Sequence, residues 1–213
     1  MWLPMALTVA AGYLLGNLNG AVSMSHLLGA QDVRNQGSGN AGLTNFLRMF
    51  GPGNALLVVV IDALKAVVAC LLGALLLKPY GFDREGLMLG GLAVSLGHDF
   101  PALLGFHGGK GVLSGIAIAL VADWRCGLLA LGVFAVCLWL TRYVSLSSIL
   151  GATVFAASFA LLQWEKPLVV ALGVLIAALI VFMHRGNISR LLRGTEKKAT
   201  FSKFRKKNAP KSL

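Results

Sequence analysis

The chain has 213 residues, of which 57% are hydrophobic and only 13% are charged, and its mean hydropathy is +0.78. A soluble domain carries about a quarter charged residues, so the composition excludes an ordinary soluble globular protein. The formal net charge is +11, and ten of the 19 Lys and Arg residues lie from Arg185 onward, with Glu196 as the one acid there. A basic segment directly after an apolar helix is typical of a cytoplasmic tail beside anionic lipid, and it argues against nucleic acid as a partner.

Long apolar runs follow one another along the chain and predict an all-α integral membrane protein with about seven transmembrane helices. The predicted spans cover residues 3–28, 54–77, 86–104, 112–122, 126–140, 147–163 and 167–183. The run at 112–122 is short for a span, so a half-helix or a re-entrant segment is an alternative there. The first run lacks a basic leader and a cleavage site, which favours a first span over a removable signal peptide. Asn17 and Asn19 interrupt this run and are expected to face the protein interior.

The charges between the spans predict an N-terminus outside and a C-terminus in the cytoplasm. In this orientation the inner loops carry four basic residues and the chain from Arg185 onward carries ten, while the charges of the outer loops cancel. Such an asymmetry obeys the positive-inside rule. The predicted organisation is one transmembrane catalytic domain at 1–196 and a basic cytoplasmic tail at 197–213, which would lie close to membrane lipids.

The first polar segment with chemical potential is 34–45, which reads RNQGSGNAGLTN. Its glycines let the backbone turn tightly and present N–H groups to an anion. A helix is expected to begin near Thr44, so its N-terminus could face the same anion. A flexible solvated loop is the alternative, although a linker needs neither Arg nor Asn. The candidate substrate ligands in and after this segment are Arg34, Gly37, Ser38, Gly39, Asn40, Thr44, Asn45 and Arg48.

The second segment, 97–112, places Lys110 between Gly109 and Gly111 at the start of a predicted span. A bare backbone and an ammonium group can meet a phosphate there. The segment is not a Walker A loop, because Gly111 stands where a Ser or Thr would hold magnesium. His98, at its start, is equally compatible with a helix-capping role.

The third segment begins at the end of the last predicted span, where His184 and Asn187 are three residues apart and share one helix face. Taken alone it is also typical of a polar cap with snorkelling arginines. Its predicted position on the same side of the membrane as the two glycine segments favours a role in one shared site.

Two further patterns complete the survey. Asp62 and Lys65 lie three residues apart inside a predicted span, where a buried ion pair is costly. The two residues could form a structural ion pair or line the wall of the site. The three cysteines are odd in number and show no CxxC spacing, so neither a disulfide framework nor a zinc site is indicated. No metal or cofactor is expected.

These residues together resemble the acyl-phosphate-dependent glycerol-3-phosphate acyltransferases, the PlsY family. The matching segments are GSGN within 34–45, DALK at 62–65, GH at 97–98 with GGKGV at 108–112, the stretch 141–148, and HR at 184–185 with NI at 187–188. They follow one another in order through most of the chain. The sequence departs from the family pattern at 16–19, which reads GNLN where GSIP is common, and at Gly186, where an acidic residue is usual.

The resemblance implies a seven-span enzyme of the bacterial inner membrane with its active site on the cytoplasmic side. Such an enzyme transfers a fatty acyl group from acyl phosphate to the 1-hydroxyl of sn-glycerol 3-phosphate, giving lysophosphatidic acid and phosphate, without a cofactor. Ser38, Arg48, Lys110, His184 and Asn187 match positions that line the family's phosphate pocket, and Thr44 and Asn45 match the loop beside it. The predicted catalytic residues are therefore Ser38, Lys110, His184 and Asn187. The predicted substrate-binding residues are Arg34, Gly37, Gly39, Asn40, Thr44, Asn45, Arg48, Gly109 and Gly111.

Acyl phosphate is already activated, so the enzyme mainly has to position the acceptor hydroxyl and stabilise charge on phosphate and carbonyl. The leaving phosphate and His184 are the two candidate acceptors of the hydroxyl proton. No Ser–His–acid triad is apparent, which assigns Ser38 to binding rather than to nucleophilic attack. A multi-span anion channel or transporter with a cytoplasmic phosphate site, and a lipid-binding scaffold, are the alternatives from other classes.

Overall fold

The computed structural model describes residues 1–199, so most of the predicted tail, 200–213, lies outside the described residues. Within that range the regular elements are all helical, which confirms the predicted all-α class. The α-helices are α1 (Trp2–Asn17), α2 (Gly20–Leu27), α3 (Leu43–Phe50), α4 (Ala55–Leu77), α5 (Asp83–Asp99), α6 (Val112–Ala122), α7 (Trp124–Thr141), α8 (Val144–Leu162), α9 (Pro167–Met183) and α10 (Arg185–Leu192). Three short 3-10 helices accompany them, η1 (Val33–Asn35), η2 (Lys78–Tyr80) and η3 (Ala102–Leu104).

Each predicted span corresponds to one helix or to one bent pair of helices. In the described part of the chain, four helices are long and apolar enough to cross a membrane, and the count rises to six if α1 with α2 and α9 with α10 each form one span. These pairs bend by 42° and 54°. The remaining predicted span is α6, whose 11 residues are too few for the roughly 20 that cross a bilayer.

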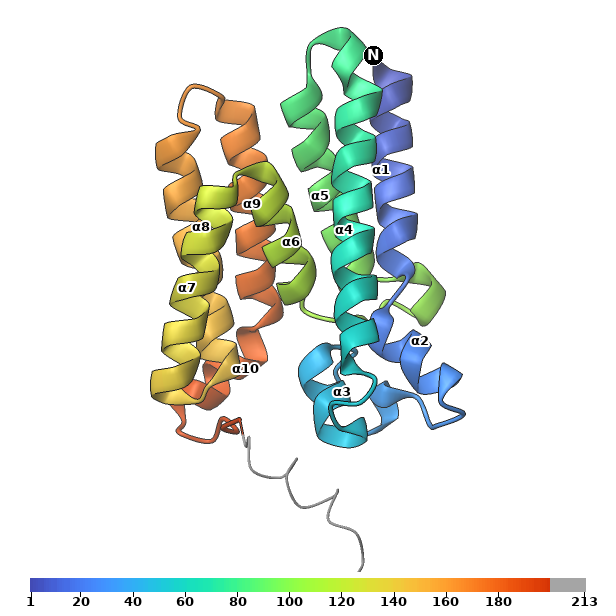
Figure 1. The fold of residues 1–213 in the computed structure, drawn as a ribbon, viewed down its shortest axis with the longest axis vertical. Coiled ribbons are helices and arrows are strands. Elements are labelled where there is room, and N and C mark those ends of the chain that lie inside the picture. The colour runs from blue at the N-terminus through green and yellow to red at the C-terminus, as the bar shows by residue number, and fades with distance from the viewer. Residues whose placement is uncertain (200–213) are drawn as a thin grey trace, which may run out of the picture.

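The long helices form two groups that stand side by side (Figure 1). One group contains α1, α4 and α5, and the other contains α6 to α9. The short helices α2, α3 and α10 and the polar segments gather at one end, and the N-terminus lies at the other (Figure 1). All three polar segments singled out in the sequence are therefore at the same end of the molecule.

Glycines let the helices of the first group approach closely. A Cβ atom on Gly73 would overlap the backbone oxygen of Gly86, and one on Gly90 would overlap the backbone oxygen of Ala69. Small residues at such crossings are how membrane helices pack without a hydrophobic driving force between them. These close contacts hold α4 and α5 against each other in their middle and at the ends joined by η2, away from the polar segments.

The break between α1 and α2 is made by the two predicted interior asparagines. Asn17 and Asn19 are 4% and 2% exposed, which confirms that they face the protein interior. The amide of Asn19 donates to the backbone oxygen of Ala41, and its side-chain oxygen caps α2 at the N–H of Val22. Asn17 accepts from the N–H of Leu103. The break is thus tied to both glycine-containing segments.

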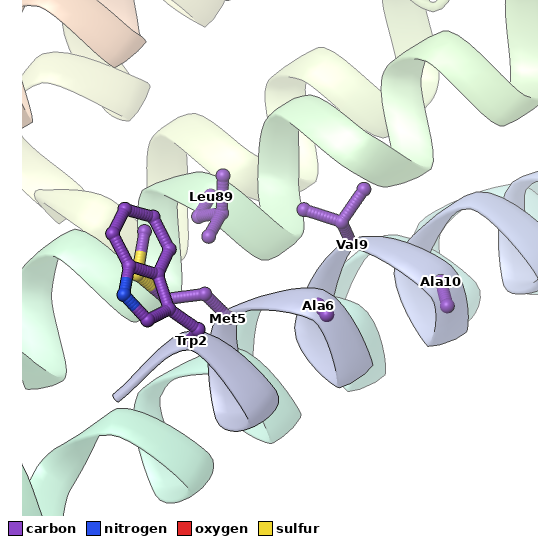
Figure 2. Close-up of a pocket in the computed structure, with 6 residues that line it drawn as sticks. All are labelled: Trp2, Met5, Ala6, Val9, Ala10 and Leu89. Carbon is purple, nitrogen blue, oxygen red and sulfur yellow. The ribbon is translucent and has the colours of Figure 1, made fainter.

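A shallow apolar groove lies on the opposite end of the molecule from these segments (Figure 2). Its lining residues are Trp2, Met5, Ala6, Val9 and Ala10 of α1 and Leu89 of α5. It contains no charged side chain among its lining and is typical of a lipid-facing surface. The chemistry of the protein must be sought at the other end.

Candidate active site

The first glycine loop is organised by a single buried side chain, Asn45, which is 2% exposed. Its amide nitrogen donates to the backbone oxygens of Val33, Gln36 and Asn40, and its oxygen accepts from the N–H of Ser38. These hydrogen bonds satisfy a loop that has no regular structure of its own. Asn45 lies in the first turn of α3, which begins where the sequence predicted.

Two glycines are required by this arrangement. Gly37 and Gly39 have φ of +63° and +72°, a region that residues with a Cβ atom adopt at a cost. A Cβ atom on Gly37 would also overlap the side-chain oxygen of Asn45. The glycines therefore allow the loop to close over Asn45, and Ser38 between them is left exposed.

The exposed face of this loop carries the groups that remain available to a ligand. Thr44 and Arg48 are both exposed and lie one turn apart on α3, next to Ser38. No hydrogen bond or ion pair to the guanidinium of Arg48 is seen from residues 1–199. A cation beside a hydroxyl and a helix N-terminus is a suitable arrangement for a phosphate.

Arg34 is differently placed. Its guanidinium group forms a bidentate pair with Asp32 at 2.8 Å and donates to the backbone oxygen of Leu104 at 2.7 Å. The pair holds the pKa of Asp32 below its usual value, chiefly through the hydrogen bonds from Arg34. Because the donors of Arg34 and Asn45 are used within the protein, both residues position the loop here, and substrate contacts from them stay a prediction.

The second glycine loop packs directly on the end of α5. The N–H of Gly109 donates to the backbone oxygen of His98 at 3.1 Å, and a Cβ atom on Gly109 would overlap the His98 ring. A Cβ atom on Gly108 would lie 2.6 Å from Pro101. Gly111, with φ of +65°, begins α6. The glycines thus let the backbone rest on α5 and present Lys110 on its other side.

Lys110 reaches the third segment, because its ammonium group donates to the side-chain oxygen of Asn187. Asn187 in turn donates to Glu196 at 2.6 Å, and the same carboxylate accepts from Ser145 and Arg190 at 2.7 Å each. Burial lowers the pKa of Lys110, and the nearby Arg190 adds to this effect. For Glu196, burial acts to raise the pKa, but hydrogen bonds from Asn187, Ser145 and Arg190 outweigh it and lower the pKa.

His184 lies beside this network and is 3% exposed. Its Nδ1 lies 2.8 Å from the backbone oxygen of Ile180, and because a carbonyl can only accept, Nδ1 carries the proton. In the neutral ring, Nε2 is then unprotonated and able to accept a proton. The geometry gives His184 the tautomer that a general base requires.

An apolar groove begins next to this cluster and runs between α6, α7, α8 and α9. Its lining at the polar end includes Val112, which follows Gly111, and Ile180, one turn before His184. Ala119, Ala130 and Phe155 line it farther into the apolar region. The groove is narrow, with a volume of about 30 Å³, and its lining is apolar and partly made of small residues of the short α6.

Comparisons with known proteins show the family of the chain. The family described as glycerol-3-phosphate acyltransferase matches residues 6–194 of the chain. A glycerol-3-phosphate acyltransferase of Thermoanaerobacter pseudethanolicus is 39% identical, over 90% of this chain and 94% of that protein. A second one, from Anaeromyxobacter sp. (strain K), is 43% identical, over 91% of this chain and 96% of that protein. The chain belongs to the glycerol-3-phosphate acyltransferase family.

Two crystal structures of PlsY, an integral membrane glycerol 3-phosphate acyltransferase, are also similar. The glycerol 3-phosphate form has a TM-score of 0.83 and 34% identity, covering 92% of this chain and 96% of that one. The lysophosphatidic acid form has a TM-score of 0.80 and 34% identity, covering 92% and 95%. The resemblance to the PlsY family seen in the sequence is thus confirmed, and the match to an integral membrane protein supports a multi-pass membrane protein. A channel or transporter finds no support in these comparisons.

For this family member, the structure unites only part of the predicted site in direct contact. Lys110 bonds to Asn187, which bonds to Glu196, and the side chain of His184 bonds to the backbone oxygen of Ile180. Ser38 and Arg48 make no hydrogen bond or ion pair to any of these residues within residues 1–199. His98, whose role the sequence left open, is a buried residue in the last turn of α5. In the same range no group of three or more His, Cys, Asp or Glu residues could hold a metal.

Sequence reasoning did not assign a site role to Ser145, Arg190 or Glu196. Ser145 lies in the 141–148 stretch that matched the family, and Glu196 follows the third segment. Their positions in or next to these segments were the signal that could have identified both residues. Their connection through one carboxylate joins residues 51 positions apart in the chain, and no local pattern reveals it.

Proposed function

We propose that the protein transfers a fatty acyl group from acyl phosphate to the 1-hydroxyl of sn-glycerol 3-phosphate, producing lysophosphatidic acid and phosphate. The observation that supports this activity most directly is the half-buried Lys110, held by Asn187 and standing between a proton-accepting His184 and an apolar groove. A phosphate needs the cation, an acceptor hydroxyl needs the base, and an acyl chain needs the groove. The relatives are glycerol-3-phosphate acyltransferases, and the two PlsY structures are a glycerol 3-phosphate form and a lysophosphatidic acid form, in agreement with the proposed acceptor and product.

The reaction is a direct transfer in a complex with both substrates. The 1-hydroxyl oxygen attacks the acyl carbonyl carbon, the bond from that carbon to the phosphate oxygen breaks, and phosphate leaves. The hydroxyl proton passes to Nε2 of His184 or to the leaving phosphate. Lys110 stabilises the negative charge that develops on the phosphate and the carbonyl oxygen, where a preorganised cation acts most strongly.

The first glycine loop supplies the remaining ligands. Ser38, Thr44 and Arg48 offer two hydroxyls and a guanidinium that make no hydrogen bond to other groups within residues 1–199, and they serve a substrate phosphate. The two substrates each carry a phosphate, and together they would bridge this loop and the Lys110 cluster. The loop and the cluster do not contact each other directly in the described residues. Gly37, Gly39, Asn40, Gly109 and Gly111 contribute backbone groups at the two loops.

Phosphate release is the direct test of the donor. The purified protein in detergent is expected to release phosphate from palmitoyl phosphate only when glycerol 3-phosphate is present, and to use neither palmitoyl-CoA nor palmitoyl carrier protein. Initial rates should give intersecting lines in a double-reciprocal analysis, because both substrates bind before transfer. Activity with palmitoyl-CoA alone as donor would contradict the proposal.

The same incubation without acceptor tests the assignment of Ser38. Intact-protein mass spectrometry is expected to show no acyl adduct, since Ser38 lies in a solvent-exposed loop with no base bonded to it among residues 1–199. An acyl group on Ser38 would establish a covalent intermediate and refute direct transfer.

The acyl chain is proposed to lie in the groove between α6, α7, α8 and α9. Ala119 lies two turns into α6 from the polar end, so replacing Ala119 with leucine fills the inner part of the groove. Burying one methylene group stabilises the complex by about 0.8 kcal/mol. If the leucine displaces two methylenes of the acyl chain, kcat/KM for palmitoyl relative to octanoyl phosphate should fall about tenfold. Competition between the two donors measures this ratio.

The matched control is Ala135→Leu, which adds the same volume to an exposed position on α7 outside the groove. It is expected to leave the chain-length ratio unchanged. An unchanged ratio in a folded Ala119→Leu variant would place the acyl chain elsewhere.

The proposed setting is the bacterial inner membrane, with the N-terminus outside and the catalytic domain, residues 1–196, open to the cytoplasm. The basic tail, residues 197–213, and the gathering of polar segments at one end support this orientation. A reporter fused after Leu213 is expected to show cytoplasmic activity. Alkaline phosphatase activity at that position would reverse the orientation.

A further inference from the structure

A cluster of charged and polar side chains lies buried beneath the second glycine loop and takes no part in the chemistry above. It consists of Asp62 and Lys65 on α4 and His98 on α5, which we call the buried cluster. These side chains are 1%, 4% and 4% exposed. Such groups are costly inside a membrane protein and are retained there for a purpose.

Lys65 is the centre of the cluster. Its ammonium group lies 2.9 Å from Asp62 and 2.8 Å from Nδ1 of His98. It also donates to the backbone oxygens of Gly16 and Leu18, at the break between α1 and α2. One ammonium group therefore ties α4, the end of α5 and the broken first span together.

Asp62 completes the connection to the break and to the next helix. Its carboxylate accepts from the N–H of Gly20, the first residue of α2. Its backbone oxygen accepts from Ser114 on α6. The cluster thus contacts the elements on both sides of the second glycine loop, which leads from α5 into α6.

His98 passes this anchoring on to the loop. Because an ammonium group only donates, Nδ1 accepts from Lys65, and the neutral ring is held in one orientation with its proton on Nε2. The ring lies against Gly109, and the backbone oxygen of His98 accepts from the N–H of that residue. Gly109 precedes Lys110 directly, so the position of the His98 ring sets the position of the Lys110 backbone.

We propose that Lys65 and His98 are positioning residues for the transfer reaction, which hold the second glycine loop so that Lys110 faces the reacting phosphate. The proposal rests on the role given to Lys110 under the proposed function. A purely structural contact between α4 and α5 would be made more cheaply by apolar residues of the same size, since buried ion pairs gain little stability over such residues. The convergence of the hydrogen bonds on the loop and the helix break accounts for the polar choice.

Three substitutions at His98 separate positioning from folding. Asparagine places an acceptor close to the position of Nδ1, so His98→Asn keeps the contact with Lys65. His98→Gln and His98→Leu lose that acceptor. Since a displacement of about 1 Å can cost a hundredfold in rate, we expect kcat/KM for glycerol 3-phosphate to fall about a hundredfold in the Gln and Leu variants and less than tenfold in the Asn variant. Ser95→Ala is the matched control, because it removes a buried hydroxyl one turn away whose one hydrogen bond within residues 1–199 goes to the backbone oxygen of Gly91.

Hydrogen exchange measures the loop without relying on activity. In the Gln and Leu variants, the peptide that covers residues 105–112 is expected to exchange faster than in the wild type, because the loop no longer rests against a fixed ring and the hydrogen bond from the Gly109 N–H to the backbone oxygen of residue 98 opens more often. The Asn and Ser95→Ala proteins should exchange at the wild-type rate. If folded His98→Leu protein shows unchanged exchange in this peptide, or faster exchange with unchanged kcat/KM, the positioning role is overturned.

The Lys65→Arg variant retains the charge beside Asp62 and tests the contact with His98 from its other partner. The changes in kcat/KM and in exchange are expected to match those of the His98→Gln and His98→Leu variants. Failure of all the His98 and Lys65 variants to fold would overturn the proposal in favour of a structural role alone. A wild-type protein that is inactive but shows normal exchange in the loop would instead refute the proposed acyl-phosphate reaction. The exchange rates of the His98 variants would then decide alone whether His98 holds the loop.

Discussion

Replacing Lys110 with alanine is expected to lower kcat/KM for the acyl transfer by about a thousandfold while the protein stays folded. Lys110 is half-buried and its ammonium group is fixed by Asn187, so it is oriented before the substrates arrive. Burial lowers its pKa, which also shows that water screens this charge less than it would at an open surface. A preorganised donor at the developing charge is worth about 10² to 10³ in rate, and a full cation lies at the upper end of that range.

The measurement is phosphate release at saturating and at low glycerol 3-phosphate, together with thermal unfolding in detergent. Arg193→Ala is the matched control, because Arg193 is an exposed basic residue that follows α10 and makes no side-chain contact with Asn187 within residues 1–199. It should retain activity within about twofold. A Lys110→Ala protein that keeps activity within a few-fold would show that Lys110 is a membrane-interface anchor and would remove the basis of the proposed mechanism.

Much of the fold could be predicted because hydropathy acts locally. The apolar runs predicted the positions of the long helices, and the last one, α9, agrees with the predicted 167–183 at both ends. The short run at 112–122 was also located, and α6 has the same bounds. The angles of the bends at the two broken pairs could not be assigned from hydropathy, because an apolar run does not record how a polar contact redirects the helix that follows.

The sequence predicted which segments form the candidate site better than it predicted what each residue does there. Glycine and cation patterns located the three segments, but the contacts that divide substrate ligands from loop supports span long distances in the chain. Arg34 bonds to Leu104, 70 residues away, and Lys65 bonds to His98, 33 residues away. Such pairings depend on the packing of α1, α4 and α5, and a single sequence carries no record of them.

Gly109→Ala is expected to lower kcat/KM by about a hundredfold, the second largest effect after Lys110. The added methyl group would overlap the ring of His98, which cannot move aside because Lys65 holds its Nδ1. A new Cβ atom closer than 3.0 Å to the ring forces one of the two groups to move, and the loop backbone is the group that is free to do so. A shift of about 1 Å at Gly109 moves Lys110 out of line with the phosphate, and misplacement of that size costs about 10² in rate.

Gly53→Ala is the matched control, because Gly53 also lies in a polar connection and a Cβ atom there would meet nothing within 4 Å. It should retain wild-type kcat/KM and unfolding temperature. The decisive comparison is Gly109→Ala in the wild-type chain against Gly109→Ala combined with His98→Asn, whose smaller side chain leaves room for the methyl group. Activity should recover at least in part in the double variant, since the overlap with the ring is the cause of the loss. A double variant no more active than Gly109→Ala alone would show that the glycine is needed for contact with substrate rather than for its fit against α5.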